Sequence, residues 1–423
     1  MAERTTEPGW RPLIVDADRR AAIETVIKDT VAAIDVWRAE HGNDHSDDAD
    51  YATLRIYVAS DELIPDPDDA AGAALAQSIT TVAERHEPGL YGGAARIAFA
   101  VGHLSAGDDA DTACEMIERS LYKYLATPND NYDLISGHVG LAVPVLQRIA
   151  DGNPSETSEP LARRILDQLE RGAREVAGGL AWHTPPELLP AWQRELAPDG
   201  YFNLGLAHGM PGVAAILARY IAAGVEVERA RRLLDGLMTY LRAVRSSTFG
   251  NRYPAWFTQA APPDEPHPTR VAWCYGDLGV AVGLLSAALA TGRDDWRADA
   301  LDLAHGMAER ADDVSGAIDA GLCHGAAGNA HLFNRLWQAS GDDRLRTAAL
   351  HWFDRALAMR RSDAIAGWPR GAPKDGVVHW EPAPDLLTGA PGIALALHAA
   401  ISPIEPAWDQ VLLSDLSPAL SPE

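Results

Sequence analysis

Residues 208–215 read HGMPGVAA, and close copies of this stretch recur along the chain. The shared pattern is Gly-x-x-Gly followed by an apolar residue and often by alanine. Further copies are SGHVGLAV at Gly137, YGDLGVAV at Gly276, HGAAGNAH at Gly325, with Asn329 in the apolar slot, and TGAPGIAL at Gly389. A degraded copy, GGAARIAFAV, begins near Gly93 and has Arg96 in place of the second glycine. About 44 to 72 residues separate successive first glycines, enough for two helices and a loop per repeat.

The stretches that follow the glycine motifs predict helices of two kinds. Gly209–Gly224 and Gly276–Thr291 are apolar nearly all round, which is typical of buried helices. Amphipathic helices are predicted over Asp294–Arg310 and Asp342–Arg360, the second with Asp342 as its N-cap. Their expected buried faces are Trp296, Ala300, Leu303 and Met307 in the first, and Leu345, Ala348, Ala349, Trp352 and Phe353 in the second. Alternating inner and outer helices predict an all-α fold, an α/α barrel or toroid of six or seven helix-pair units. We expect the glycines to let neighbouring inner helices and loops approach closely at one rim.

The remaining segments are predicted to be loops around this repeat. Proline-rich stretches at Thr184–Tyr201, Thr248–Thr269 and Ser362–Pro384 indicate long loops that enter glycine motifs from the same side. Residues 43–50, NDHSDDAD, are predicted to form a solvated acidic loop. Since no linker divides the chain, we expect one domain over residues 1–423, with the repeats at about 90–402 and a C-terminal tail at 403–423.

Composition excludes several classes of protein. Lys plus Arg number 36 against 60 Asp plus Glu, and the net charge of -24 argues against nucleic acid or an anionic membrane as the main partner. No apolar run reaches the roughly 18 residues of a membrane span, and MAERTTEPGW lacks the plan of a secretory signal. Three cysteines in so long a chain indicate a reducing compartment, so we expect a cytoplasmic protein.

Aligning the repeats on their first glycine brings two of these cysteines into one slot. Cys274 and Cys323 each stand two residues before that glycine, and His324 follows Cys323 directly. Equivalent slots on adjacent inner helices should lie at the same height and face the same axis. Two cysteines and a histidine are typical zinc ligands, and three protein ligands leave the open position of a catalytic site. We therefore predict one Zn²⁺ per chain, whereas Cys114 is expected to be a buried structural residue.

Other polar residues occupy matching slots. His208 stands one residue before Gly209, as His324 does before Gly325, and we interpret it as a fourth zinc ligand or, preferably, a general acid/base. Asp133 and Asp385 each lie four residues before a first glycine, where a carboxylate can be an N-cap or a functional group. The flanks of Cys274 hold Arg270 and Tyr275, which are either structural or, for the cation, placed to stabilise developing negative charge.

NLGLAHGMPG (Asn203–Gly212), WCYGDLG (Trp273–Gly279), LCHGAAGN (Leu322–Asn329) and LLTGAPGIALAL (Leu386–Leu397) resemble the signature segments of the lanthionine synthetase C, or LanC-like, family. The resemblance runs from about Leu90 to the end of the last repeat. It departs at Leu278, where proline is common, and at Arg96, and neither touches the presumed metal site. It implies an α/α toroid with zinc held by Cys274, Cys323 and His324. It also implies His208 as acid/base, with Asp133, Arg270 and Tyr275 as active-site residues.

The resemblance further implies a stand-alone cyclase that acts on a precursor peptide dehydrated by a separate enzyme. Such an enzyme adds peptide cysteine thiols to dehydroalanine or dehydrobutyrine and forms (methyl)lanthionine rings. A thiol of pKa about 8.5 is mostly protonated at neutral pH, and zinc binding deprotonates it. Three alternatives stay open: a LanC-like enzyme that uses glutathione as the thiol donor, a zinc-dependent transferase of the prenyltransferase type, and a non-catalytic peptide-binding scaffold.

Overall fold

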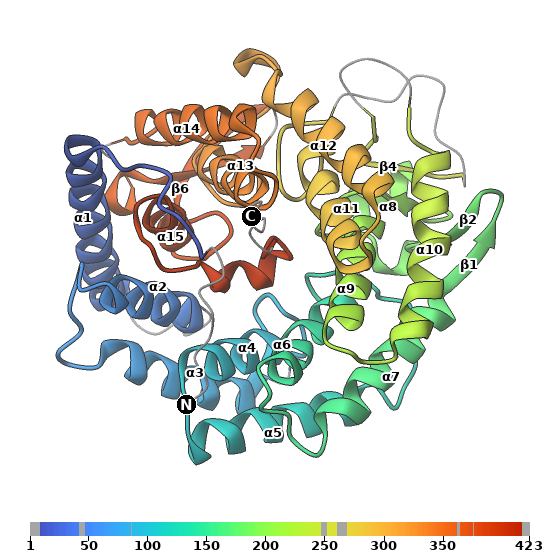
Figure 1. The fold of residues 1–423 in the computed structure, drawn as a ribbon. Helices are drawn as coiled ribbons and strands as arrows, with labels where there is room; N and C mark the ends of the chain where they lie inside the picture. Colours follow the sequence, from blue (N-terminus) through green and yellow to red (C-terminus); the bar gives the residue numbers. More distant parts are fainter. Residues whose placement is uncertain are drawn as a thin grey trace. The chain divides into compact units, whose positions relative to one another are not determined.

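The computed structural model describes residues 9–41, 47–85, 87–246, 252–259, 269–361, 364–374 and 376–416. The chain divides into two compact units. The first unit comprises residues 1–74, 308–409 and 414–423, and the second comprises residues 75–307 and 410–413. Helices make up most of both units, and the described strands form three short two-stranded pieces (Figure 1).

The first unit holds two N-terminal helices and the last repeats. Its helices are α1 (Ala17–His41), α2 (Asp48–Ser60), the start of α3 (Ala70–Arg85), α13 (Ala326–Ser340), α14 (Asp343–Ala358) and α15 (Ala390–Ile401). Between and after them lie η3 (Asp312–Val314), η4 (Ile365–Gly367), the strands β5 (Pro369–Lys374) and β6 (Val377–Pro382), and the start of η5 (Ala407–Leu412).

The second unit holds the earlier repeats. Its helices are the rest of α3, then α4 (Ala94–Leu104), α5 (Asp108–Tyr124), α6 (His138–Ala150), α7 (Ser158–Gly172), α8 (Ala191–Leu196), α9 (Met210–Ala222), α10 (Val227–Ala243), α11 (Asp277–Thr291) and α12 (Asp294–Ala308). Its shorter elements are β1 (Ala173–Val176), β2 (Gly179–Trp182), η2 (Pro186–Leu188), β3 (Phe202–Asn203) and β4 (Trp256–Phe257).

Every glycine motif opens a buried helix, as the repeat predicts. The first glycine of each motif is the N-cap of α4, α6, α9, α11, α13 or α15; these glycines are Gly93, Gly137, Gly209, Gly276, Gly325 and Gly389. Even the departures from the pattern are buried, since Arg96 is 4% and Asn329 is 1% exposed. The buried helices therefore begin where the sequence places them.

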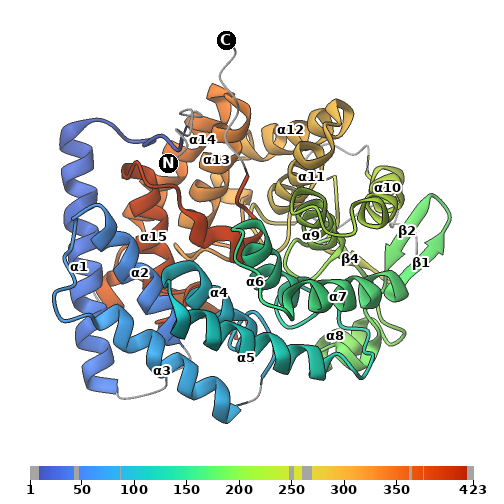
Figure 2. The ribbon, with the colours of Figure 1, turned by 60° about the horizontal axis from the view of Figure 1, so that its bottom comes forward.

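Within each unit, buried helices pack against one another and against amphipathic partners. In the second unit the buried helix α6 contacts α4 and α9, and α9 contacts α11 (Figures 1 and 2). The amphipathic helix α5 packs on α4, α7 packs on α6, and α10 packs on α9. In the first unit α13 packs against α14 and α15, and α15 also contacts α1 and α2. The amphipathic helices α12 and α14 bury all the residues that the pattern predicts, and Asp342 caps α14 by accepting from the Arg344 backbone N–H at 2.9 Å.

In the five motifs that keep both glycines, close backbone contacts require both of them. A Cβ on Gly328 would lie 1.9 Å from the Leu322 carbonyl oxygen, and one on Gly276 would lie 2.0 Å from the Arg270 carbonyl oxygen. In each case the contact is with the residue six positions earlier. Gly276 also has a φ of 134°, a region that side chains disfavour. Thus each helix start folds back on the loop that leads into it.

Three of the predicted loops need correction. Ser362–Pro384 contains an antiparallel hairpin, β5 paired with β6 from Pro369↔Pro382 to Lys374↔Val377, and only 362–363 and 375 lie outside the described residues. Its prolines argue against a central strand, but a two-stranded hairpin has free edges that tolerate them. Thr184–Tyr201 contains η2 and α8 and closes on itself through two backbone hydrogen bonds of 2.8 and 3.0 Å between its end residues.

The third correction concerns the acidic stretch 43–50. Residues 42–46 lie outside the described residues, but Asp48 opens α2, is 1% exposed and pairs with Arg38. It is therefore not solvated. Of Thr248–Thr269, residues 248–251 and 260–268 lie outside the described residues, and the described part holds β4, which pairs with β3. Of the predicted tail, 417–423 lies outside, and the rest includes η5.

A buried ionic cluster holds the C-terminal segment of the first unit to α13. Arg335 and His331, both wholly buried, contact the buried carboxylate of Asp409 at 2.7 Å each. Arg335 also pairs with Glu405 at 2.8 Å. Burial by itself would raise the pKa of Asp409, but the charge of Arg335 and the hydrogen bonds from His331 and Arg335 lower it to about 2. In the part of the chain that the structure describes, no helix combines the length and apolar character needed to cross a membrane.

The glycine contacts predict a sharp difference between two Gly→Ala variants. Gly328→Ala should destabilise the protein by about 3 kcal/mol or more, because its new methyl group meets a backbone carbonyl that cannot move aside. Gly306→Ala, in α12, meets nothing within 4 Å and should be neutral or stabilising by up to about 1 kcal/mol. Denaturant unfolding followed by circular dichroism measures both. Equal effects of the two variants would contradict this account of the repeat.

The ionic cluster predicts an acid-sensitive contribution to stability. The lowered pKa of Asp409 means that its stabilisation is present above the ordinary carboxyl pKa near 4 and is lost as the pH falls toward 2. Asp409→Asn should cost about 3–5 kcal/mol at pH 7, because it leaves Arg335 buried beside a neutral group. The control Glu159→Gln breaks an exposed pair with Arg163, the one ion pair of Glu159 among the described residues, and should cost at most about 1 kcal/mol. Urea unfolding at several pH values tests the prediction, and a loss in Asp409→Asn no larger than in the control refutes it.

Candidate active site and metal ligands

The Asp133 carboxylate and the His208 ring lie in direct contact in the second unit. His208 Nδ1 donates to Asp133 Oδ2 at 2.7 Å, which leaves Nε2 as the ring nitrogen available for other chemistry. The other carboxylate oxygen, Oδ1, accepts from the backbone N–H groups of Ser136 and Gly137, both at 2.9 Å. Asp133 therefore has both roles that its position allows, capping and a contact with a functional group. One carboxylate oxygen stabilises the start of α6, and the other orients His208.

Asp385 shows what the same slot does without a histidine beside it. Its two carboxylate oxygens accept from the Thr388 backbone N–H and hydroxyl, both at 2.8 Å. Among the described hydrogen bonds it has no histidine partner. Asp385 is therefore a structural equivalent of Asp133, and this pair separates the capping role of the slot from the orienting role.

Tyr275 is the aromatic neighbour of His208. Their rings stack with centroids 5.9 Å apart. The Tyr275 hydroxyl accepts from Asn203 Nδ2 at 3.1 Å, and the wholly buried Asn203 also accepts from the Gly205 backbone N–H at 2.9 Å. Burial, reinforced by the neighbouring Tyr201, raises the pKa of Tyr275 well above its ordinary value. Tyr275 is thus a neutral phenol that can donate a hydrogen bond.

The loop that carries His208 packs directly on the backbone of Cys274. A Cβ on Gly205 would lie 2.3 Å from the Cys274 carbonyl oxygen and 2.6 Å from a ring carbon of Tyr275. Glycine at this position therefore lets the Asn203–Gly209 loop approach Cys274 and Tyr275. Cys274 itself is buried, with 7% of its surface exposed. The second unit brings His208, Asp133 and Tyr275 together beside the backbone of Cys274.

The first unit supplies Cys323 and His324, which are both partly exposed. The Cys323 backbone N–H donates to the carbonyl of Leu387 at 2.8 Å, and both residues stand two positions before a first glycine. Tyr91 and Ile135, in the same slot of two repeats of the second unit, are joined in the same way at 3.0 Å. Equivalent slots of successive repeats are therefore neighbours in each unit.

A cavity of about 480 Å³ in the second unit gives access to His208. Asp133, His208 and Tyr275 line it, together with Tyr132, Tyr201 and residues of the Thr184–Tyr201 segment. Arg270 is not among its lining residues; it is exposed, and its side chain has no ion pair among the described residues. The cavity therefore brings together three of the four predicted catalytic residues.

A family model for lanthionine synthetase C-like proteins matches residues 52–413, most of the chain. The chain belongs to this family. The nisin biosynthesis protein NisC of Lactococcus lactis subsp. lactis is 28% identical over 289 residues, which are 58% of this chain and 62% of that protein. The match thus spans less than two thirds of the relative's length. The solved structure of a nisin cyclase is 17% identical in sequence and superimposes with a TM-score of 0.75. The match covers 94% of this chain and 98% of the nisin cyclase chain. This likeness confirms the predicted fold class, the all-α toroid of the LanC-like family.

Neither Asn203 nor Tyr201 is among the site residues predicted from the sequence, although Asn203 bonds the Tyr275 hydroxyl and Tyr201 lines the cavity that holds His208. Asn203 stands six residues before Gly209, and the same slot holds Asn131 and Asp319 in other repeats. Both Asn203 and Asp319 accept from the backbone N–H two residues later, at 2.9 and 3.1 Å. The repeat alignment thus carried a signal for Asn203. Tyr201 lies in an insertion between repeats, where the alignment carries no information.

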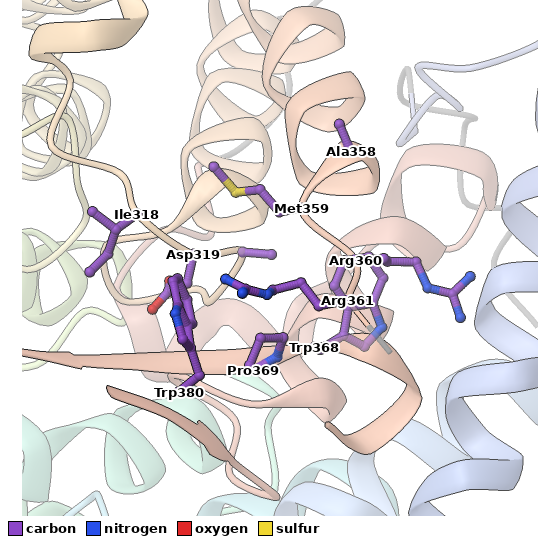
Figure 3. A pocket seen from close by; sticks show the side chains of 10 residues that line it. Ile318, Asp319, Ala358, Met359, Arg360, Arg361, Trp368, Pro369 and Trp380 are labelled. Carbon is purple, nitrogen blue, oxygen red and sulfur yellow. The ribbon is translucent and has the colours of Figure 1, made fainter. Parts of the chain in front are cut away.

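A second cavity, of about 320 Å³, lies in the first unit between the β5–β6 hairpin and the loop that leads to Cys323 (Figure 3). In Figure 3 Arg361 points toward Asp319 and Trp380, and its guanidinium carbon lies 4.4 Å from the centre of the Trp380 ring. Both oxygens of Asp319 accept backbone N–H groups, from Gly321 and Gly371. Asp319 is thus engaged in holding the hairpin to the loop.

Proposed function

We propose that this chain is a zinc-dependent cyclase of lanthipeptide biosynthesis. It would add cysteine thiols of a precursor peptide to dehydroalanine or dehydrobutyrine and so form (methyl)lanthionine rings. A separate dehydratase would supply the dehydrated peptide, and both enzymes would act in the cytoplasm. The observation that carries the proposal is the Asp133–His208 pair stacked on Tyr275 in an open cavity, in a chain of the LanC-like family.

The proposed ligands of one zinc ion are Cys274, Cys323 and His324. Two thiolate sulfurs and one imidazole nitrogen suit zinc and leave a fourth position for a substrate thiol. When bound, zinc would deprotonate that thiol, and the two cysteine thiolates would keep the metal a weak Lewis acid, so that the substrate sulfur stays nucleophilic. The backbone pairing of equivalent repeat slots within each unit supports this assignment, because Cys274 and Cys323 occupy that slot in successive repeats.

The proposed role of His208 is to deliver a proton to the α-carbon of the acceptor. The substrate sulfur forms a bond to the β-carbon, and the electrons of the double bond move onto the adjacent carbonyl as an enolate. His208 Nε2 would take up the proton that the substrate thiol releases and, as imidazolium, would then return it to the α-carbon. Asp133 holds the ring through Nδ1 and stabilises the imidazolium that must form first.

The enolate requires stabilisation before it is protonated. Tyr275 is a neutral phenol at the same cavity and would donate a hydrogen bond to the developing oxyanion. Asn203 holds the Tyr275 hydroxyl in place. Arg270 is exposed outside the cavity lining, so its proposed contribution is a long-range positive charge or a contact made only with bound substrate.

The test of the proposed function is thiol alkylation followed by mass spectrometry. A peptide with one dehydroalanine and one cysteine is incubated with the zinc-loaded protein, and the wild type should consume the thiol without a change in peptide mass. Glutathione is supplied in a parallel arm, and a mass increase by one glutathione would instead identify the alternative thiol donor. Consumption of neither thiol by the zinc-loaded wild type would refute the proposal.

Two variants separate the metal from the acid/base. Cys274→Ala should lose bound zinc and all thiol consumption, because only two ligands remain. His208→Asn should keep one zinc per chain but slow cyclisation by about 10²–10⁴-fold, the usual range for a general acid. Zinc is measured by atomic absorption. Full zinc content in Cys274→Ala would rule out its role as a ligand, and full activity in His208→Asn would remove that residue from the mechanism.

The repeat offers a matched pair for the role of Asp133. Asp133→Asn keeps an oxygen for the α6 backbone but loses the carboxylate that pairs with His208, so kcat should fall by about 10²-fold. Asp385→Asn changes the same slot where no histidine lies, so it should alter stability by about 1 kcal/mol and leave kcat unchanged. Initial rates of thiol loss and thermal midpoints are measured together. Equal losses of kcat in the two variants would assign Asp133 to structure alone.

A further inference from the structure

The segment Thr184–Tyr201 is an ordered wall of the cavity that holds His208. Glu187, Leu188, Pro190 and Gln193 line the cavity from this segment. Its end residues pair with each other, and Arg194 donates to the carbonyls of Pro186 and Leu189 at 3.0 and 2.9 Å. The segment therefore has a defined surface beside the candidate active site.

This segment has a small core of its own. Leu189, Ala197 and Tyr201 are buried together, and Trp256 packs against them with its ring stacked 5.4 Å from that of Tyr201. The Tyr201 hydroxyl also donates to Gln193 at 3.2 Å, across the segment. The side chains that hold the segment in place are therefore distinct from those that remain on its surface.

Three large apolar side chains remain exposed on this segment. Leu188, Trp192 and Leu196 are 43, 60 and 61% exposed and recur every four residues, which places Trp192 and Leu196 on one face of α8. Leu188 also lines the cavity. An apolar cluster of this kind, beside a cavity with catalytic groups, is typical of a surface that binds a partner. We name these three residues the apolar stripe.

We propose that the apolar stripe docks an apolar, positively charged segment of the peptide substrate while a neighbouring residue reacts in the cavity. This inference rests on the proposed function and adds the substrate class. Two features favour this occupant. Leu188 joins the apolar stripe to the cavity, and the cavity lining carries acidic side chains.

The charges of the cavity lining favour a cationic segment. The lining contains Asp130, Asp133 and Glu187 and no lysine or arginine. Asp133 contacts His208. Asp130 forms an ion pair of 3.2 Å with Arg171, which lies outside the cavity lining. Glu187 has no ion pair among the described residues, and it directly precedes Leu188 in the sequence. A lysine or arginine beside apolar residues in the peptide would complement Glu187 and the stripe together.

A second copy of this chain fits the stripe less well than a peptide does. The chain carries a net charge of -24, so two copies repel each other at the acidic rim of the cavity. A short cationic peptide meets attraction at the same place. Tryptophan is also a frequent anchor of binding energy at such surfaces, so Trp192 is the expected main contact.

The experiment compares the double variant Trp192→Ser/Leu196→Ser with Met116→Ser. Met116 is an equally exposed apolar residue, 67%, on α5 and outside the cavity lining, so it controls for the loss of surface apolarity. The probe is a fluorescein-labelled peptide with one dehydroalanine, one cysteine and a flanking Leu-Leu-Lys. Binding is followed by anisotropy and reaction by thiol loss, and thermal midpoints verify that the variants are folded.

We expect the double variant to raise Kd and KM at least 10-fold with kcat within about twofold of wild type, while Met116→Ser changes neither. A peptide whose flank is Ser-Ser-Lys should bind wild type and double variant equally. Glu187→Lys should prefer a Leu-Leu-Glu flank over Leu-Leu-Lys, which reverses the wild-type order. This reversal would assign the charge preference to Glu187.

Three results would overturn the inference. One is a Kd for the Leu-Leu-Lys peptide that is the same in the wild type and the double variant. The second is a wild-type dimer in ultracentrifugation that the double variant abolishes, which would make a second copy the occupant. The third is binding that depends on the stripe equally for all flanks. If the wild type binds the peptide through the stripe but consumes no thiol, the proposed function fails and the docking surface stands, because anisotropy does not require turnover.

Discussion

The close contact between each helix start and the carbonyl six residues earlier organises the rest of this structure. In five of the six repeats, a glycine at both positions of the motif lets the first turn of a buried helix press against its own entering loop, at distances that leave no room for a Cβ; in α4 the second position holds Arg96. The backbone N–H after the first glycine can then close the loop, as His138 does to the Asn131 carbonyl at 2.9 Å. Backbone contacts consequently hold the loop before each buried helix against the start of that helix.

Within these loops, the same slot supports the backbone in the same way in more than one repeat. The slot four residues before the first glycine holds a capping carboxylate, in both Asp133 and Asp385. The slot six residues before holds a side chain that accepts a backbone N–H, in both Asn203 and Asp319. Such a group can take a catalytic role when one of its atoms is not used by the backbone. Asp133 is the example, since its Oδ2 contacts His208 while its Oδ1 accepts backbone N–H groups. The catalytic arrangement proposed here is therefore an elaboration of contacts that the fold needs in any case.

This organisation explains which features could be predicted from the sequence. The starts of the buried helices follow from a repeat that aligns with itself, and the buried faces of α12 and α14 follow from their helical periodicity. The grouping of His208 with Asp133 and Tyr275 is implied by the resemblance to the LanC-like family, and the structure places these side chains together. The β5–β6 hairpin and α8 lie between repeats, and their prolines and short lengths conceal regular structure. The burial of Asp48 depends on Arg38, a partner that no periodicity identifies. The location of Arg270 outside the cavity also escaped prediction, because adjacency to Cys274 in sequence does not fix the direction of a side chain.

The same division separates the proposed chemistry from the proposed recognition within the chain. Groups with proposed chemical roles sit in or beside the motif slots, where a change of position by one residue would lose the glycine contact. The intervals between motifs are free to vary in length, and the longest, between Gly137 and Gly209, holds the β1–β2 hairpin and the segment with the apolar stripe. A loop on a rigid scaffold can change its surface without disturbing the core. Under the proposals made above, the apolar stripe could therefore change without disturbing the helix starts, because Leu188, Trp192 and Leu196 lie outside the glycine motifs.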